Sequence, residues 1–297
     1  DAAQLWQECL AEHLLGIGFV RGRSNPCVYF HPDKGLRVLV HGDDYASAGP
    51  VEALKWMKGE LESRLEMKNV IVGHSSEAEV KDEGKILNRV IRATERGWQY
   101  ECDQRHVEVL VQELELASNR SLATPGVDDV LNKQGEPEAD NSEPLGVEDA
   151  STYRALAARC NYIAVDRADA QYAIKELCRD MAKPTVASWD RLVRVGRYFL
   201  GRPRAVVIFD WQQFADTIDV FTDANWAGCR TSRKSTSGGV AMVGRCCVKS
   251  WSKTQGTIAQ SSAESELLAT VRGATEGLGL ISLACDLGMD MKELLIW

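Results

Sequence analysis

The sequence predicts an α+β protein, because strand-like and helix-like segments occur in separate runs along the chain. Short apolar runs bounded by turn residues predict strands at 27–40 and again from 205 onward. Between these regions, residues 153–200 carry apolar residues at helical spacing. The 297 residues, 44% hydrophobic and 26% charged, suffice for two globular domains of ordinary size.

The N-terminal part of the chain reads as alternating helices and hairpins. Apolar spacing predicts helices at 6–16 and 52–65, and a third that begins after Asp103 and runs to 116. Strands at 27–30 and 36–40 flank a turn that contains Pro32 and Gly35. A second hairpin joins strands at 86–92 and 97–102.

The middle of the chain reads as a linker followed by helices. Residues 123–146 are polar, acidic and broken by proline, which predicts a linker or long loop. Helices follow at 153–165, 168–181 and 189–200, the last capped by Thr185 or Ser188. On this last helix Arg191, Arg194 and Arg197 recur at roughly helical spacing. They form either a face that tracks a nucleic-acid backbone or an ordinary solvated helix face.

The C-terminal part reads as strands, a helix and a final strand. Strands are expected at 205–209, 219–221, 239–243, 247–251 and 291–297, with a helix from 262 between the last two. Ser261 and Glu264 form an S-x-x-E capping box at the start of this helix. Helical spacing predicts that its core-facing stripe consists of Leu267, Val271, Ala274 and Leu278.

Asp223 and Glu266 are candidate metal ligands in this part. Asp223 ends a predicted strand, and Glu266 lies one turn into the helix, beside the predicted stripe. Two carboxylates brought together repel unless a cation lies between them, and such oxygen ligands suit Mg²⁺. The alternative is a pair of unrelated surface acids. Arg233 and Lys234 are candidate phosphate contacts, or solvated loop charges.

A second acidic pair, Asp43 and Asp44, follows the strand at 36–40 in the order Gly-Asp-Asp. Two carboxylates in a tight turn between hairpin strands can bind metal, as in polymerases. Without context, the same residues form a good turn sequence. Gly42 before the pair also suggests a viral RNA polymerase, but that reading leaves residues 221–269 unexplained.

Four sequence motifs carry a family resemblance. They are Asp-Ala-Asn-Trp-Ala-Gly at 223–228, Arg-Lys-Ser-Thr-Ser-Gly at 233–238, Ser-Trp-Ser-Lys-Thr-Gln at 250–255 and Ser-Ser-Ala-Glu-Ser-Glu at 261–266. Their order and spacing resemble the RNase H domain of copia-type LTR retrotransposon polyproteins. Upstream, the residues at 18–19, 26–29 and 43–44 resemble the reverse-transcriptase palm of the same family. Gly42 departs from that pattern, which more often has a bulkier apolar residue there.

The resemblance implies a partial reverse-transcriptase palm and thumb at 1–120, an acidic linker and helical connection at 121–204, and a C-terminally truncated RNase H-like mixed sheet with its helix at 205–297. Asp43 and Asp44 would hold Mg²⁺ against a template–primer and an incoming deoxynucleotide. Asp223 and Glu266 would hold Mg²⁺ at the RNA strand of an RNA·DNA hybrid. The family's remaining acids are expected upstream of residue 1 and beyond Trp297. The alternative is a catalytically inactive relic or a nucleic-acid-binding module.

Composition narrows the remaining possibilities. The net charge of −8 argues against a uniformly basic nucleic-acid binder, although residues 191–209 contain five arginines and no acid. The nine cysteines form no CxxC pair and are expected to be free thiols in a reducing compartment. No apolar run suggests a membrane span, and no signal pattern begins the sequence. The resemblance implies an intracellular location, in a cytoplasmic particle or the nucleus.

Overall fold

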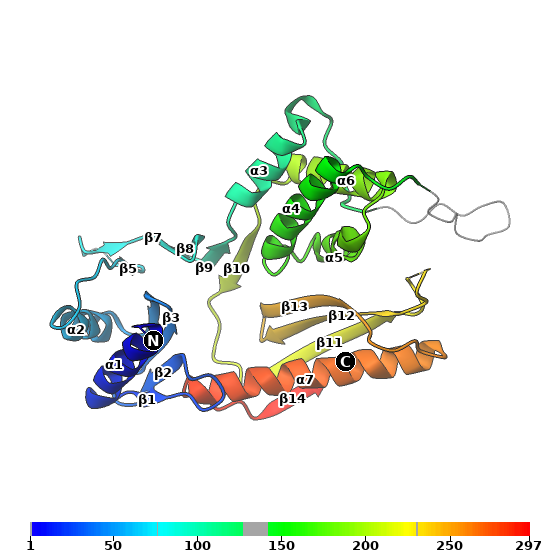
Figure 1. Cartoon of the computed structure of the whole chain (residues 1–297). Coiled ribbons are helices and arrows are strands. Elements are labelled where there is room, and N and C mark those ends of the chain that lie inside the picture. Colours follow the sequence, from blue (N-terminus) through cyan, green and yellow to red (C-terminus); the bar gives the residue numbers. More distant parts are fainter. Residues whose placement is uncertain (1, 76, 127–141, 230) are drawn as a thin grey trace.

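The computed structural model describes residues 2–75, 77–126, 142–229 and 231–297, and it confirms the α+β class. Figure 1 shows an N-terminal body, a helical body, and a sheet flanked by the long helix α7, with β10 running between the helical body and this sheet. The linker predicted at 123–146 falls mostly within 127–141, outside the described residues.

The N-terminal body packs helices against an antiparallel sheet of order β1–β2–β3–β4. Its elements are α1 (Ala2–Gly16), β1 (Val20–Arg21), β2 (Val28–His31), β3 (Leu36–His41), β4 (Asp44–Ala48) and α2 (Val51–Glu62). Alternation along β3 buries Leu36 and Val38 and exposes Leu39, as the two-residue period of a strand requires. The buried side chains join Leu14 of α1 and Met57 of α2 in one core, so the predicted helices and hairpin are confirmed.

The second sheet has the order β10–β9–β8–β7. It contains β7 (Glu83–Ile86), β8 (Arg89–Thr94), β9 (Gly97–Glu101) and β10 (Val206–Asp210), and β5 (Ile71–Val72) pairs with β6 (Val80–Lys81) nearby. The strand predicted at 86–92 is instead divided by a turn at Leu87 and Asn88, which have φ of 46° and 65°. β10 pairs antiparallel with β9, so this late strand closes a sheet begun more than a hundred residues earlier.

The helical body comprises α3 (Arg105–Glu113), η1 (Leu116–Ser118), α4 (Val147–Ile163), α5 (Gln171–Arg179), η2 (Asp180–Ala182) and α6 (Val186–Gly201). Its core includes the fully buried Tyr153, Leu192 and Phe199. Of the two predicted caps, Thr185 is the N-cap of α6: its hydroxyl oxygen accepts from the Ser188 backbone N–H at 3.3 Å. Ser188 completes the box by accepting from the Thr185 N–H at 3.1 Å.

The C-terminal sheet has the order β13–β12–β11–β14. Its elements are β11 (Thr217–Asn225), β12 (Thr236–Val243), β13 (Cys246–Thr254), α7 (Ser262–Asp286) and β14 (Glu293–Ile296). Strands β11 to β13 are antiparallel, and the chain then returns through α7 to place β14 parallel to β11. The buried Ile218, Val220 and Trp251 form its core.

Helix α7 begins at the predicted position, with a modified capping box. The Ser261 hydroxyl oxygen accepts from the Glu264 backbone N–H at 3.1 Å, as predicted. The Glu264 carboxylate accepts from the backbone N–H of Gln260 at 2.6 Å, one residue before the N-cap. The Ser261 hydroxyl therefore satisfies an N–H group that the first turn leaves unpaired, and the Glu264 carboxylate fixes the residue that precedes the N-cap.

The face of α7 that packs on the sheet is not the predicted one. Leu267, Val271 and Leu278 are 62%, 56% and 58% exposed, so the predicted stripe points outward. The buried residues of the helix are small: Ser265, Ala269, Gly273, Gly277 and Ala284. A Cβ added at Gly273 would lie 2.4 Å from Cγ2 of Thr222, so the helix backbone approaches β11 too closely for a side chain.

Exposed apolar side chains, Leu267, Val271 and Leu278, also give α7 an apolar composition. Among the described residues, it is the one helix long and apolar enough to cross a membrane by length and composition alone. The small-residue face of the helix nevertheless packs against the strands of the C-terminal sheet.

The C-terminal end of α7 is joined to the N-terminal body. The Asp286 carboxylate accepts from the backbone N–H groups of Arg23, Ser24 and Asn25 at 2.8, 2.9 and 2.8 Å. The Ser24 hydroxyl also donates to it, and these hydrogen bonds hold the pKa of Asp286 below its usual range. Figure 1 shows this end of α7 beside β2.

Candidate active site

Asp43 and Asp44 lie at the tip of the β3–β4 hairpin, as predicted. His41 pairs with Asp44, so Gly42 and Asp43 form the turn between the strands. Gly42 has a φ of 65°, a left-handed conformation that glycine adopts without steric cost. Both carboxylates are exposed. Gly42 therefore suits the backbone conformation of this turn.

The base of this hairpin tip is fixed by aromatic residues. Trp6 Nε1 of α1 donates to the backbone carbonyl of Gly42 at 3.0 Å. Burial raises the pKa of Tyr45 to about 12, and the negative charge of Asp43 adds to the effect. The Tyr45 hydroxyl is buried and has no hydrogen-bond partner among the described residues. The exposed carboxylates of Asp43 and Asp44 therefore lie next to the partly buried aromatic side chains of Trp6 and Tyr45.

Asp223 lies near the end of β11 and pairs with Gly238 of β12. The strand continues to Asn225, two residues beyond Asp223 and four beyond the predicted strand at 219–221. Asp223 is exposed, whereas Val220 is fully buried on the α7 side. Side chains alternate between the two faces of a strand. Thr222 faces α7, so the side chain of Asp223 lies on the opposite face of the sheet.

Glu266 is placed at the same end of the sheet by the course of α7. A Cβ at Gly277 would meet Leu294 of β14, and a Cβ at Gly273 would meet Thr222, further along the parallel strands. Glu266 precedes Gly273 by seven residues on the same helix stripe, which is about 10 Å along the axis. It therefore lies level with the end of β11, half-buried. Asp223 and Glu266 approach this sheet end from its two faces.

These acids partly fit a metal centre. Within the described ranges, no group of three or more His, Cys, Asp and Glu side chains is arranged to hold a metal ion. The two carboxylates at the β11 end supply oxygen ligands of the kind that Mg²⁺ takes, and Asp43 and Asp44 supply another such pair. Asp223 and Glu266 lie on opposite faces of this sheet end, so a metal ion shared by them would have to lie beyond the end of β11, and further ligands would have to complete its shell.

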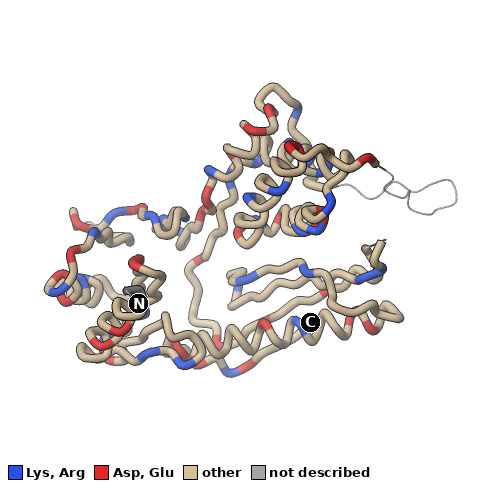
Figure 2. The backbone as a smooth tube through the Cα atoms, viewed as in Figure 1, with Lys and Arg blue, Asp and Glu red and all other residues tan. Residues whose placement is uncertain are grey.

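Arg233 and Lys234 lie in the turn that leads into β12, at the same sheet end as Asp223. Asn225 pairs with Thr236, and the Cys229 backbone N–H donates to the Lys234 carbonyl at 3.0 Å. Figure 2 shows Lys and Arg positions along β13 and near this turn. The acids of this sheet end are therefore flanked by positive charge.

The arginines of α6 have partners within the protein. Arg191 pairs with Asp180 at 2.6 Å, Arg194 donates to the Thr124 hydroxyl at 2.9 Å, and Arg197 donates to the Arg120 carbonyl at 2.8 Å. The contacts of Arg194 and Arg197 attach the segment at 120–124 to the helix. This structural role stands beside the predicted one in nucleic-acid binding.

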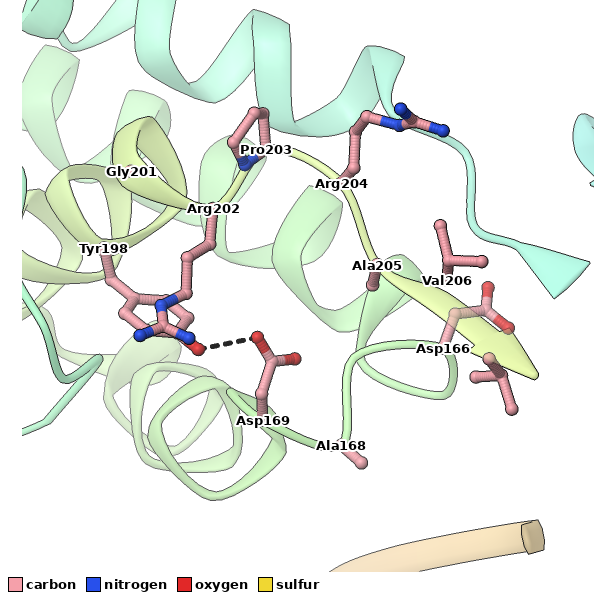
Figure 3. A pocket seen from close by; sticks show the side chains of 11 residues that line it. Asp166, Ala168, Asp169, Tyr198, Gly201, Arg202, Pro203, Arg204, Ala205 and Val206 are labelled. Carbon is pink, nitrogen blue, oxygen red and sulfur yellow. Dashed lines mark hydrogen bonds between the residues drawn. The ribbon is translucent and has the colours of Figure 1, made fainter. Parts of the chain in front are cut away.

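A cavity of about 540 Å³ lies where α6 leads into β10 (Figure 3). Its Asp169 carboxylate accepts from the Tyr198 hydroxyl at 2.7 Å and pairs with the fully buried Arg167. Arg204 on its wall pairs with Glu101, and with Arg92 it holds the pKa of Glu101 at about 2. These charged side chains are therefore paired with one another. The pair of Arg204 and Glu101 links the end of the helical body to the β7–β10 sheet.

Sequence reasoning missed a smaller cleft close to the acids. It lies between α7 and the end of β13 and includes Lys253, Gln255 and Arg272. Lys253 and Gln255 belong to the motif at 250–255, so the signal was present as a pattern without an assigned role. Their alternation with the buried Trp251 would have placed both on the core side of the strand.

Comparison with known proteins gives distant but extended similarity. No protein-family model matches the chain. It is 35% identical over 133 residues to the uncharacterized mitochondrial protein AtMg00810 of Arabidopsis thaliana, covering 43% of this chain and 53% of that protein. It is 26% identical over 297 residues to the retrovirus-related Pol polyprotein from transposon RE2 of the same plant, covering 99% of this chain and 19% of the polyprotein. The chain thus spans about half of the first relative and about a fifth of the second.

A solved structure shares the fold. It is a foamy viral protease–reverse transcriptase in complex with double-stranded DNA, with a TM-score of 0.50 and 11% identity, covering 100% of this chain and 42% of that one. The polyprotein matches extend over practically the whole chain. The chain is therefore distantly similar, over its whole length, to part of the Pol polyproteins of copia-type retrotransposons.

Proposed function

We propose that this chain is part of a polyprotein that copies RNA into DNA and cleaves the RNA of RNA·DNA hybrids. Residues 1–120 supply part of a palm and thumb, 121–204 a connection, and 205–297 a ribonuclease H-like domain whose first strand, β10, pairs with β9 of the preceding sheet. One observation carries the hydrolase assignment. Antiparallel strands β11 to β13 are followed by the crossover helix α7 and the parallel strand β14, with Asp223 and Glu266 at one sheet end.

The residues divide into two sets of roles. The β3–β4 turn presents Asp43 and Asp44 toward a primer end and an incoming deoxynucleotide. At the C-terminal sheet, Asp223 and Glu266 hold Mg²⁺, which when bound activates water and neutralises phosphate charge. Arg233 and Lys234 attract the phosphates of the hybrid to this end. The location that follows is intracellular, in a particle or the nucleus.

The test is Mg²⁺-dependent cleavage of labelled RNA in an RNA·DNA hybrid. It uses the full chain, alone and with the segments that adjoin it in the parent polyprotein. Asp223→Asn should lower the rate roughly 100-fold or more, because metal-based charge stabilisation contributes several kcal/mol. Asp290→Asn, an exposed acid before β14, is the matched control and should leave the rate unchanged. Equal rates in both variants would remove Asp223 from the reaction.

A second candidate is a nucleic-acid-binding module without catalysis. Two observations favour it. Among the described residues, each candidate metal site has two carboxylates, and the basic residues Arg233 and Lys234 lie at the same sheet end as Asp223. It predicts hybrid binding by every form of the chain and no metal-dependent cleavage by any. Cleavage that depends on Asp223 would reject it.

A further inference from the structure

His106 of α3 lies where the helical body meets the β7–β10 sheet. Its ring packs against the ring of Tyr162 in α4, with the two centroids 4.5 Å apart and the planes inclined at 41°. The Tyr162 hydroxyl accepts from Nη1 of Arg89 at 3.1 Å, and the guanidinium of Arg89 lies over the same ring, 5.2 Å from its centroid. One tyrosine therefore contacts both His106 of α3 and Arg89 of β8.

Arg89 also attaches the sheet to the helical body. Its Nε and Nη2 donate to one carboxylate oxygen of Asp166 at 3.1 and 2.8 Å, and the Tyr100 hydroxyl of β9 donates to the other at 2.8 Å. Asp166 follows α4, and its side chain is 8% exposed. This buried carboxylate therefore joins two strands to the end of one helix. We call the group of Arg89, Tyr100, His106, Tyr162 and Asp166 the sheet–helix joint.

His106 is the member of the joint whose charge changes near neutral pH. Its Nδ1 is buried and has no hydrogen-bond partner among the described residues. Its Nε2 lies 3.8 Å from Oδ2 of Asp103, beyond hydrogen-bond distance. Protonation makes both ring nitrogens donors, so Nδ1 would carry a buried N–H without an acceptor. The packing of the joint therefore suits the neutral ring.

The charges around His106 also oppose its protonation. Arg89 faces it from β8, Arg159 from α4, and Arg105 from the first residue of α3. Asp103 supplies the opposing negative charge, but Arg105 already binds it, because Nε and Nη2 of Arg105 donate to its two oxygens at 3.1 and 2.8 Å. Burial lowers the pKa of His106, Asp103 opposes this effect, and the three arginines add to the lowering.

We propose that His106 makes the sheet–helix joint acid-sensitive. With a neutral ring, α3, α4 and β8 pack around Tyr162. Protonation places a further cation beside three arginines, so the contact between α3 and α4 loosens and the helical body is held less firmly against the β7–β10 sheet. The face of a tyrosine attracts a cation, but this attraction does not offset the repulsion, since the Arg89 guanidinium already lies over the ring.

The first measurement is urea unfolding of the full chain between about pH 8 and about pH 5, for the wild type and for His106→Phe. Phenylalanine keeps a ring against Tyr162 and cannot take up a proton. Because the folded pKa of His106 is lowered, the unfolded chain binds the proton first as pH falls below 6.5, and stability is lost there. The unfolding equilibrium constant of the wild type, relative to that of His106→Phe, should rise about threefold or more over this range.

Two more variants test whether the neighbouring charges set this effect. Arg105→Gln removes a cation and frees Asp103 to pair with the protonated ring, so the loss of stability in acid should shrink. The side chain of Arg105 is 63% exposed, so its replacement leaves the core intact. His74→Phe changes an exposed histidine and is the matched control, which should show the pH dependence of the wild type.

Hydrogen exchange at equal pH locates the loosened contact. In acid the wild type should exchange faster than His106→Phe in α3, β8 and the end of α4, and equally fast in α7. The inference is overturned by an equal pH dependence of the two chains, by a wild type that gains stability in acid relative to the variant, or by faster exchange confined to other elements. These measurements need neither metal nor substrate, so their outcome is independent of the proposed catalysis.

Discussion

Two glycines of α7 should respond in opposite directions to the same substitution. Gly273 faces β11, where an added Cβ would lie 2.4 Å from Thr222 Cγ2 and 3.1 Å from Val220 Cγ1. Gly279 is exposed in the same helix, and an added Cβ there meets nothing within 4 Å. Comparing the two alanine substitutions therefore separates the effect of close packing on stability from the effect of helix propensity.

The magnitudes follow from these surroundings. Alanine in a helix interior is favoured over glycine by about 1 kcal/mol, so Gly279→Ala should stabilise by roughly that amount. At Gly273 the same gain is opposed by overpacking of about 1–3 kcal/mol. Thr222 cannot easily move aside, because its N–H and hydroxyl both donate to the Trp297 carbonyl, at 2.9 and 3.1 Å. Gly273→Ala should therefore be neutral or destabilising by up to about 2 kcal/mol.

Urea denaturation followed by circular dichroism measures both variants against the wild type. A difference of about 1–3 kcal/mol between the two alanine variants is expected, with Gly279→Ala the more stable. Equal stabilisation of the two would refute the close approach of α7 to β11. It would also reopen the possibility that the leucine stripe faces the core.

Two further changes test the hairpin tip and the joint of α7. Gly42→Ala should cost about 1–2 kcal/mol in urea unfolding, because φ at this position is 65° and no atom lies within 4 Å to cause a clash; Gly42→Asn should cost less. Asp286→Asn should lower the urea midpoint at neutral pH. The folded pKa of Asp286 is depressed, so its stabilisation is present above the usual carboxyl pKa and is lost as pH falls through the folded value. The variant and the wild type should therefore converge in acid, and a gap that persists there would contradict the role of the carboxylate.

The start of α7 and its packing face show what sequence could and could not predict. Ser261 was identified as the cap because capping depends on residues within one turn. The packing face was assigned wrongly because hydrophobic spacing assumes that large apolar residues face the core. Here Ala269, Gly273 and Gly277 face it, since they alone allow so close an approach.

The candidate site also has features that the sequence could predict and features that it could not. The turn at Asp43 was predictable, because a hairpin tip is fixed by neighbours in sequence. The partners of Arg194 and Arg197 were not, because residues 120–124 lie about seventy positions away and reach α6 only through the tertiary fold. The cleft at Gln255 was invisible for a related reason. Its walls come together only when α7 is placed beside the end of β13.

Because Asp286 is hydrogen-bonded to the loop at 23–25, α7 spans the distance between the N-terminal body and the C-terminal sheet. From Asp286 back to Glu266 the helix rises about 30 Å, and both ends are fixed, one to the N-terminal body and the other to the sheet. The length of α7 therefore sets the distance between the pair Asp43 and Asp44 and the pair Asp223 and Glu266. Four residues more or fewer would shift Glu266 by about 6 Å and nearly preserve its direction, whereas two residues would turn it to the opposite side of the helix.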